Sequence, residues 1–271
     1  MNYRHGYHAG NFADVVKHLA LVAILQHLKK KDTAFSVVDS HAGRGIYDLT
    51  GEEAAKTGEA RGGVARLVNL TEEMPPALDT YLALVKQGGP SRYPGSPLLA
   101  AQLLRPQDRL TAIEKHPQEF AALKDALAPY ATAQVEQGDG YARSLKLLPP
   151  PSRRGLVVMD PPFEATDEFE SLGRSVSGAV RKFATGIFLI WYPVKSQPAT
   201  DAFIGEVLSA GITKALTVDT QISAPEGKLE RAGLLVINPP YGFDAEMFAA
   251  AQVIAAPLGA DIAVKWRAGS P

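Results

Sequence analysis

Short apolar runs rich in β-branched residues recur along this chain, and most are separated by segments with helical periodicity. Such runs predict buried strands, and their alternation with helices predicts an α/β fold built on a doubly wound, mostly parallel sheet. Seven strands are expected, at Phe35–Asp39, Leu110–Glu114, Ala133–Gln137, Leu156–Asp160, Ile187–Trp191, Ala215–Ile222 and Leu234–Asn238.

The segments between these strands predict the helices that cover the sheet. The first helix is expected to begin after an N-cap at Asn11 and to end near Lys30. The others are expected at Pro117–Ala128, Gly140–Leu147, Asp167–Phe183, Ala199–Ala210 and Phe243–Ala256. The last two long strands leave no room for a crossover helix, so we expect them to pair antiparallel. A short strand at Ile262–Trp266 is expected to add an edge.

The stretch between Gly45 and Arg109 breaks the alternation, because its proline and glycine content rises. Helix-like pieces at Gly62–Leu70 and Ala77–Lys86 predict a small helical insertion over residues 48–92. The flanking parts, residues 1–47 and 93–271, are expected to form one domain. The apolar residues of the insertion fit either a satellite core or a wall over a substrate site.

Composition and charge narrow the classes of function. The chain has 271 residues and no cysteine, which excludes disulfides, thiolate metal sites and a cysteine nucleophile. The formal net charge of −1 excludes a polycationic coat for nucleic acid, so such contact needs a local basic patch. The candidates are Lys29–Lys31, Arg153–Arg154 and Arg181–Lys182. Neither a signal-peptide pattern nor an apolar run of about 20 residues is found, so we expect a cytoplasmic protein.

Four residues, Asp160-Pro161-Pro162-Phe163, directly follow one of the predicted strands. The prolines end the strand, so a carboxylate is fixed at its carboxyl end, where open α/β sheets bind ligands. The carboxylate and a neighbouring carbonyl can accept the hydrogen bonds of an exocyclic amine, and the aromatic ring can stack on the base. D-P-P-[YF] is the hallmark of enzymes that methylate such amines with S-adenosylmethionine. Taken alone, the motif is equally consistent with a plain turn.

Acidic residues also end the neighbouring strands. Asp39 precedes the glycine-containing turn of residues 41–45, where His41 can reach a ligand and Gly43 lets the backbone approach it. Glu114 is placed to accept the two hydroxyls of a ribose, and Asp139 is placed to meet an adenine amine. Each acid alone also fits a helix cap or a solvated turn, but together they predict a nucleotide-like cofactor. The complete glycine patterns for NAD or ATP phosphates are missing.

A second motif, Asn238-Pro239-Pro240-Tyr241, matches the same pattern and also follows an apolar strand. That strand is expected to run antiparallel to the others, so its end lies at the opposite edge of the sheet. We therefore place the chemistry at Asp160 and expect a structural turn at Asn238.

The segment of residues 2–18 is dense in aromatic, basic and imidazole groups. A metal cluster of His5, His8 and His18 is one reading, but the spacing matches no known ligand set, so no metal is expected. The favoured interpretation is a wall over the cofactor and the target base.

Motifs along the whole chain resemble the RlmJ family, bacterial adenine-N6 methyltransferases of 23S ribosomal RNA. The motifs are Y-R-H-x-x-H-A-G-N-x-A-D-V-x-K-H, D-x-H-A-G-x-G, Y-P-G-S-P, E-x-H-P, R-R-G-L-x-x-x-D-P-P and W-Y-P-V. The resemblance extends from Tyr3 to about Trp266. It implies a class I, Rossmann-like methyltransferase fold with a seven-stranded, mostly parallel sheet, one antiparallel strand and a small helical insertion.

The resemblance also implies the roles of individual residues. S-adenosylmethionine is expected to be bound by His18, His41, Gly43, Ser96, Glu114, Asp139, Gly140 and Asp160. Catalysis is expected to involve Asp160, Pro161, Phe163 and Lys17, and contact with RNA to involve Tyr3, His5, Lys17 and Phe163. Phe163 departs from the tyrosine more common in the family, which keeps stacking and removes a hydroxyl.

The expected substrate is a single-stranded or flipped adenine of 23S ribosomal RNA, and a monomer without metal or membrane contact is expected. Similar motifs occur in DNA adenine-N6 and protein glutamine methyltransferases, which stay open as alternatives. A nicotinamide oxidoreductase and a non-catalytic RNA-binding module are further alternatives.

Overall fold

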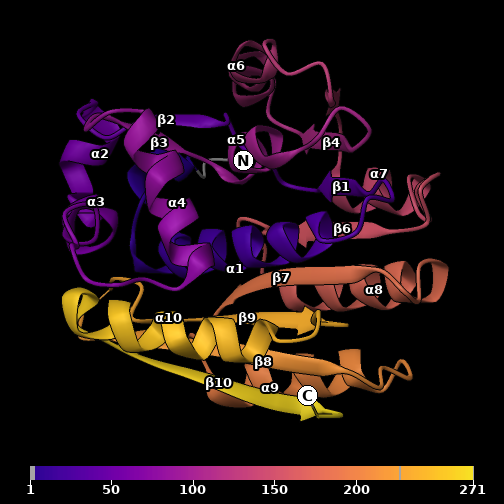
Figure 1. Ribbon diagram of the computed structural model, residues 1–271. Coiled ribbons are helices and arrows are strands. Elements are labelled where there is room, and N and C mark those ends of the chain that lie inside the picture. The colour runs from indigo at the N-terminus through magenta and orange to yellow at the C-terminus, as the bar shows by residue number, and fades with distance from the viewer. Residues whose placement is uncertain (1–3, 226, 271) are drawn as a thin grey trace.

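The computed structural model describes residues 4–225 and 227–270. Its centre is an eight-stranded sheet with the order β10-β8-β9-β7-β6-β1-β4-β5 within this described part (Figure 1). The strands are β1 Ser36–Asp39, β4 Arg109–Glu114, β5 Ala133–Gln137, β6 Gly155–Met159, β7 Ile187–Pro193, β8 Ala215–Ile222, β9 Arg231–Ile237 and β10 Ala260–Ala268.

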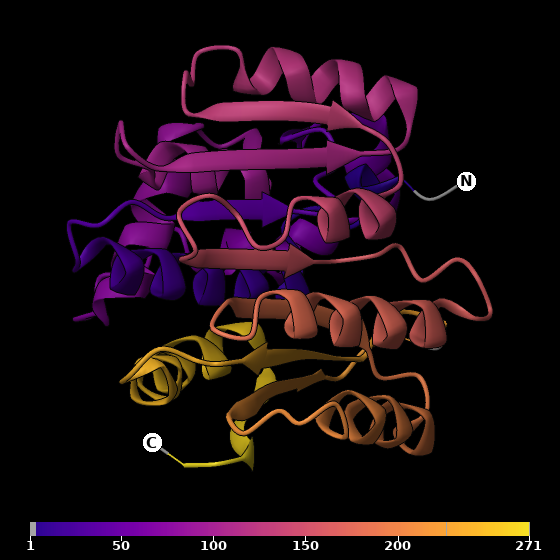
Figure 2. The ribbon, with the colours of Figure 1, turned by 90° about the vertical axis from the view of Figure 1, so that its right-hand side faces the viewer.

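Five neighbouring strands, β5, β4, β1, β6 and β7, run parallel, and the arrowheads of β5, β4, β1 and β6 point the same way in Figure 2. β9 lies antiparallel between β7 and β8, which confirms the antiparallel pairing predicted for the last two long strands. The edge strand expected at Ile262–Trp266 is confirmed as β10, which is longer than expected at both ends. It pairs antiparallel with β8 through eight residue pairs, so the sheet has eight strands rather than seven. None of the residues of β10 is fully buried, so the apolar signal of this strand in the sequence is weak.

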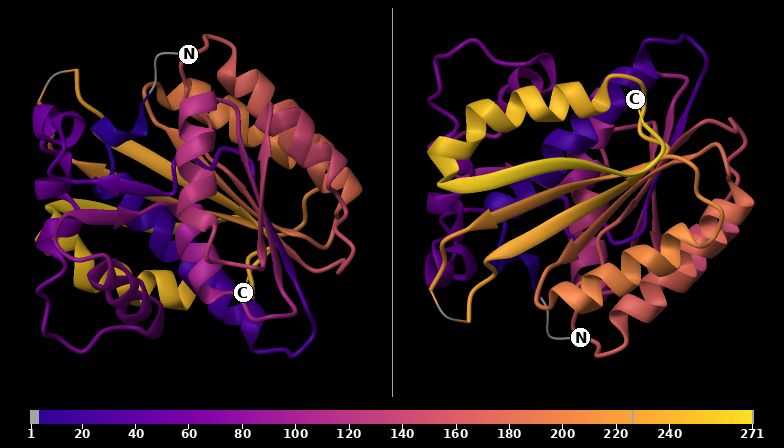
Figure 3. Two further views of the ribbon diagram at one scale, coloured as in Figure 1. Left: turned by 90° about the horizontal axis from the view of Figure 1, so that it is seen from above. Right: turned by 90° about the horizontal axis from the view of Figure 1, so that it is seen from below.

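Helices cover both faces of the sheet (Figure 3). They are α1 Phe12–Lys29, α5 Ser96–Leu103, α6 Pro117–Leu127, α7 Gly140–Lys146, α8 Glu168–Lys182, α9 Gln197–Leu208 and α10 Phe243–Leu258. One apolar cluster joins α1, α5, α6 and α10 to one face, and a second joins α8 and α9 to the other. Asn11 caps α1 as predicted, since its side-chain oxygen accepts a hydrogen bond from the Asp14 amide. No helix in residues 4–225 or 227–270 combines the length and apolarity of a membrane span.

The predicted insertion is framed by a small two-stranded sheet of β2 Ile46–Asp48 and β3 Arg92–Pro94. Between these strands lie α2 Glu52–Thr57, α3 Glu59–Gly62, the 3-10 turn η2 Val64–Arg66 and α4 Pro76–Gln87. The buried side chains of Val64, Leu67, Leu78 and Leu82 belong to the same apolar cluster as α1, not to a separate core. The division of the chain into two domains stays a prediction.

The helix predicted at Gly62–Leu70 is wrong. Helix α3 ends at Gly62, and only the short turn η2 follows. The reason is a close contact between backbones: a Cβ on Gly63 would lie 2.1 Å from the carbonyl oxygen of Gly10. At Gly63 the chain leaves the helical conformation, with φ −114° and ψ −116°, where it passes the backbone of Gly10.

The second proline motif lies where its strand direction predicts. Ile237 pairs with Phe188 near the start of β7, so the following residue, Asn238, lies at the edge of the sheet opposite to Asp160. The Asn238 side chain donates hydrogen bonds to the carbonyl oxygens of Ala184 and Gly186, at 2.9 and 2.8 Å. Its φ of 53° is in the left-handed region, which asparagine tolerates. Asn238 is a structural turn residue, as predicted.

Candidate active site

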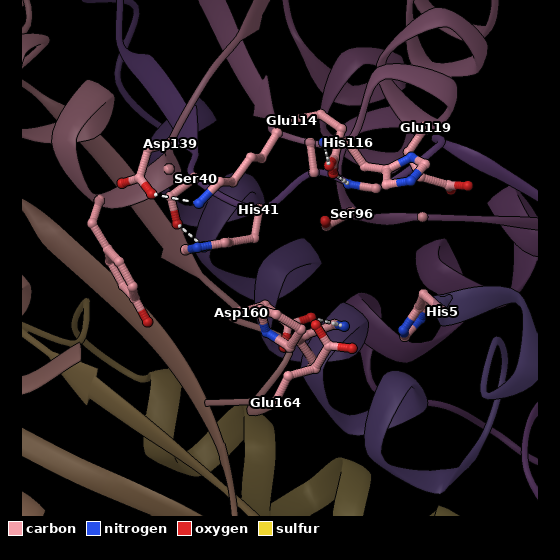
Figure 4. Close-up of a pocket in the computed structure, with 18 of the residues that line it drawn as sticks. His5, Ser40, His41, Ser96, Glu114, His116, Glu119, Asp139, Asp160 and Glu164 are labelled. Atoms are coloured by element: carbon pink, nitrogen blue, oxygen red, sulfur yellow. Dashed lines mark hydrogen bonds and ion pairs between the residues drawn. The ribbon is translucent and has the colours of Figure 1, made fainter. Parts of the chain in front are cut away.

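A cavity of about 380 Å³ lies at the carboxyl ends of β5, β4, β1 and β6. Ten of the predicted site residues line it: His5, Lys17, His18, His41, Gly43, Ser96, Glu114, Asp139, Gly140 and Asp160. In Figure 4, Glu114 and Asp139 lie in the upper part of the view and Asp160 lies in the lower part, with His41 between these two levels and His5 to the right of Asp160. The fold thus brings together residues spread over most of the chain.

Three predicted residues are placed differently. Pro161 is buried beside the cavity, and Phe163 does not line it. With a φ of 50°, Phe163 directs its ring against Phe169 and Trp191, whose ring centroids lie 4.9 and 5.7 Å away. Tyr3 lies outside the described residues.

Lys17 connects the proline motif to α1. Its Nζ donates to Asp160 Oδ2 at 2.5 Å and to Asp14 Oδ1 at 2.8 Å. The side chain is almost fully buried, and burial alone would lower its pKa. The carboxylates of Asp14 and Asp160 outweigh that effect and raise the pKa of Lys17. A fixed ammonium group therefore holds one oxygen of Asp160.

His18 follows on the same helix and lines the cavity. A hydrogen bond of 2.7 Å joins its Nδ1 to the hydroxyl of Tyr93, which in turn lies 2.9 Å from the hydroxyl of Tyr81. Burial lowers the pKa of His18 to about 3, so its ring is neutral. The Nε2 atom is then the ring nitrogen left for a ligand, and residues of β3 and α4 fix its direction.

Glu114 ends β4 and faces the glycine turn after β1. Its Oε2 accepts the amide of Gly43 at 2.9 Å, and its Oε1 accepts the amide of His116 at 2.7 Å. Burial raises the pKa of Glu114. Each carboxylate oxygen has two lone pairs, so Glu114 can still accept two hydroxyl groups. Gly43 has a φ of 63°, and a Cβ there would lie 2.2 Å from the Tyr47 hydroxyl.

Asp139 caps α7, because its Oδ1 accepts the amide of Ala142 at 3.1 Å. Partial burial would raise its pKa, but this hydrogen bond and another from Lys115 Nζ lower it. The next residue, Gly140, lies so near the strand β1 turn that a Cβ would meet the carbonyl oxygen of Ser40 at 2.0 Å. Gly140 and Ser40 both line the cavity, so this close approach sets its width at that point.

His41 lies across from Asp139. A hydrogen bond of 2.7 Å joins its Nδ1 to Ser40 Oγ, and its ring meets Tyr141 edge-on at 4.9 Å. Burial lowers the pKa of His41 to about 4, so this ring is neutral too. The described part of the chain contains no group of three or more His, Cys, Asp or Glu side chains placed to hold a metal ion.

Several lining residues escaped the prediction: Ser40, Tyr47, Lys115, His116, Glu119, Tyr141, Glu164 and Glu168. Tyr141 donates to Glu168 Oε1 at 2.6 Å and so joins α7 to α8, while Arg44 forms a two-pronged ion pair with Glu119 at 2.7 and 2.8 Å. The E-x-H-P motif was a signal for His116. The others lie in loops, in β2 or on the helices α6, α7 and α8, and no local pattern shows that they face the cavity.

The buried carboxyl group of Asp39 should make the stability of the protein depend on pH. Its side chain is buried, Oδ2 accepts from Ser96 Oγ at 2.7 Å, and Oδ1 has no hydrogen-bond partner. Burial raises the pKa of Asp39 to about 6 from 3.8, although the Ser96 hydrogen bond opposes this. The folded protein therefore holds the proton of Asp39 up to a higher pH than the unfolded chain does. Because the unfolded chain loses this proton near pH 4 and the folded protein near pH 6, the free energy of unfolding falls as the pH rises from about 4 to 6.

The expected loss in the free energy of unfolding over this pH range is on the order of 2 to 3 kcal/mol. Urea unfolding of wild type and Asp39→Asn at pH values between 4 and 7 checks it. The wild type should lose stability relative to Asp39→Asn as the pH rises. Parallel curves would contradict the assignment.

Comparisons with known proteins support the family resemblance and the fold. A family model described as "Ribosomal RNA large subunit methyltransferase D, RlmJ" matches residues 32–268. The chain belongs to the RlmJ family. "Ribosomal RNA large subunit methyltransferase J" of Escherichia coli K12 is 38% identical over 253 residues, which cover 91% of this chain and 90% of that protein. The Haemophilus influenzae protein of the same name is 36% identical over 254 residues, with the same coverage.

A solved structure extends the comparison to three dimensions. The crystal structure of protein LPL1258 from Legionella pneumophila has a TM-score of 0.89 and 31% identity, covering 97% of this chain and 99% of that one. As an RlmJ family member, the chain is a methyltransferase, and its mostly parallel sheet with an antiparallel strand is the class I methyltransferase fold. The recognition from sequence motifs is confirmed.

Proposed function

We propose that this protein transfers a methyl group from S-adenosylmethionine to the N6 amine of an adenine in 23S ribosomal RNA. One observation carries the proposal: Asp160 of the Asp-Pro-Pro-Phe motif shares a cavity with Glu114, Asp139 and Gly140 at the ligand-binding edge of the sheet. The names of the RlmJ relatives support a ribosomal RNA substrate. We further propose that it acts as a monomer in the cytoplasm.

The cavity fits S-adenosylmethionine on three features of its own. Glu114 keeps lone pairs for ribose hydroxyls, and Gly140 leaves open the space that a side chain would fill. Behind Ser96, the buried Asp39 does not line the cavity, but its Oδ1 has no hydrogen-bond partner, and its carboxylate would favour a positively charged group in the adjoining space. The residues proposed to hold the cofactor are His18, His41, Gly43, Ser96, Glu114, Asp139, Gly140 and Asp160. Bound there, the cofactor supplies an electrophilic methyl group.

The chain's own residues prepare the amine. The lone pair of an adenine amine is delocalised into the ring, so the nitrogen is a poor nucleophile. Lys17 holds Asp160 Oδ2, and no described residue donates a hydrogen bond to Oδ1. We assign to Oδ1 and the Pro161 carbonyl the two hydrogen bonds of the amine, which favour a tetrahedral nitrogen. The Asp160 carboxylate then stabilises the positive charge that develops on N6, and the proton leaves afterwards.

The target adenine must leave its stack with neighbouring bases, because its amine has to reach Asp160 inside the cavity. A bulged or single-stranded adenine fulfils this condition. His5 and Lys17 border the path from the rim to Asp160, and we assign them, together with Tyr3, to RNA contact. Phe163 can stack on the base only if its ring leaves Phe169 and Trp191, so its role depends on a local rearrangement.

The test is transfer of tritiated methyl groups to protein-free 23S ribosomal RNA from cells that lack this gene, followed by nucleoside analysis. N6-methyladenosine is the expected product. The matched control is Asn238→Ala, which alters the second proline motif and should keep the transfer rate per folded molecule. DNA and protein are offered in parallel. Transfer to either of them, with none to RNA, would replace this proposal by one of the two alternative methyltransferase classes.

A further inference from the structure

Asp14 is a buried carboxylate next to the cavity that does not line it. It is the third residue of α1, and its amide is held by the Asn11 cap. Its side chain is 2% exposed, so no substrate can reach it. A buried carboxylate is stable only when neighbouring groups pair with it or donate hydrogen bonds to it, and these partners indicate the role of Asp14.

Each oxygen of Asp14 has fixed partners. Oδ1 accepts from Lys17 Nζ at 2.8 Å, and Oδ2 accepts from His5 Nε2 and from the Gly10 amide, both at 2.9 Å. Lys17 and His5 line the cavity, and they come from two different segments, α1 and the short turn η1 His5–Tyr7. Asp14 thus binds two basic side chains of the cavity lining: Lys17, which also contacts Asp160, and His5.

We propose that Asp14 is a positioning residue, which directs Lys17 onto Asp160 and holds His5 at the rim of the cavity. This inference rests on the proposed function, because it assigns Asp14 a part in the same methyl transfer. Asp14 touches neither substrate nor cofactor and acts through Lys17 and His5.

The geometry explains why an anchor is needed. The lysine side chain is a flexible stem of four methylene groups with a point charge, and it has no preferred direction of its own. Between two carboxylates, its Nζ is confined to one place, and Asp160 Oδ2 is confined with it. A misplacement of about 1 Å in a group of this kind lowers a rate by about 100-fold.

The charges around Lys17 support the same role. The groups that face it electrostatically are Asp14, His18, Asp39, Tyr81 and Asp160. Burial lowers its pKa, while Asp14 and Asp160 raise it and prevail. Without the charge of Asp14, a single carboxylate has to balance the burial. The pKa of Lys17 should then fall.

The experiment combines kinetics with a direct observation of Lys17. Asp14→Asn should lower kcat by about 10- to 100-fold, with the Kd of S-adenosylmethionine changed less than about twofold. In a Lys17→Met background, Asp14→Asn should cause no further loss of kcat, because the group through which it acts is gone. Asp79→Asn, which removes an exposed carboxylate from the first turn of α4, is the control for a lost helix charge and should keep kcat.

NMR of protein labelled with ¹³C-lysine gives the second readout, which needs no substrate. The wild-type Lys17 signal should show no titration before the protein unfolds in alkali, whereas in Asp14→Asn it should begin to titrate within that range. Unchanged titration, or an equal loss of kcat with and without the Lys17 side chain, would overturn the positioning role. If the wild type methylates no RNA, the proposed function fails by itself, and the titration still decides whether Asp14 controls Lys17.

Discussion

Asp160→Asn is expected to lower kcat for methyl transfer by about 100- to 1000-fold, which corresponds to the removal of one preorganised electrostatic contact. An amide has no negative charge for the positive charge that develops on N6. The amide also replaces one hydrogen-bond-accepting oxygen by an NH₂ donor. This donor would face either the ammonium group of Lys17 or the amine of the substrate, and both are donors themselves. The Kd of S-adenosylmethionine should change much less, because Glu114, Asp139 and the glycine turns are untouched.

Single-turnover kinetics with saturating cofactor, beside calorimetric titration of the cofactor, separates the two effects. Asp167→Asn serves as the matched control, since it removes an exposed carboxylate from the same loop and should keep kcat. Losses of similar size in kcat and in cofactor affinity would show that Asp160 serves binding and not the chemical step.

The sequence predicts the chemistry of this edge because each signal there is local. A β-branched run, an acid and a Pro-Pro pair stand together at Asp160, and Glu114 also follows an apolar run. Asp139 follows the more polar segment Ala133–Gln137, and a glycine comes directly after it. Because these strands are parallel neighbours, their carboxyl ends lie at the same edge of the sheet, and the acids that follow them lie close together. The opposite position of Asn238 follows from loop length alone, because a short loop allows only an antiparallel return.

Features that depend on packing could not be predicted in the same way. Helix α5 is buried on nearly every side, so its sequence has no amphipathic period to detect. β2 and β3 have three residues each and are too short for an alternation. The direction of the Phe163 ring depends on a left-handed φ and on two aromatic neighbours from other elements.

The role of Asp14 was hidden for a related reason. In the sequence it is an ordinary acid in the first turn of a helix, where the helix dipole favours negative charge. Only the folded structure shows that His5 of η1 and Lys17 donate hydrogen bonds to the two oxygens of its carboxylate. In the sequence, a positioning residue such as Asp14 cannot be distinguished from any other acid in the first turn of a helix.

Gly140→Ala is the second change with a large expected effect, since it tests the contact that brings α7 against β1. A Cβ at this position would lie 2.0 Å from the carbonyl oxygen of Ser40 and 2.9 Å from His41 Nε2. Backbone atoms on both sides must then separate, and both sides line the cavity. We expect the Kd of S-adenosylmethionine to rise by about 10- to 100-fold, and the free energy of unfolding to fall by about 1 to 3 kcal/mol.

Calorimetric titration and thermal unfolding measure these two quantities, and Gly205→Ala is the control. Gly205 lies inside α9, and its Cβ would meet no atom within 4 Å, so the same substitution there should stabilise the helix by up to about 1 kcal/mol. Its cofactor affinity should equal that of the wild type. If Gly140→Ala also bound normally, the gap between α7 and β1 would have to be wider than the cofactor requires, and the assignment of Asp139 and Gly140 to the cofactor would fall. A weakened Kd in Gly140→Ala alone would tie cofactor binding to this contact, independently of any substrate.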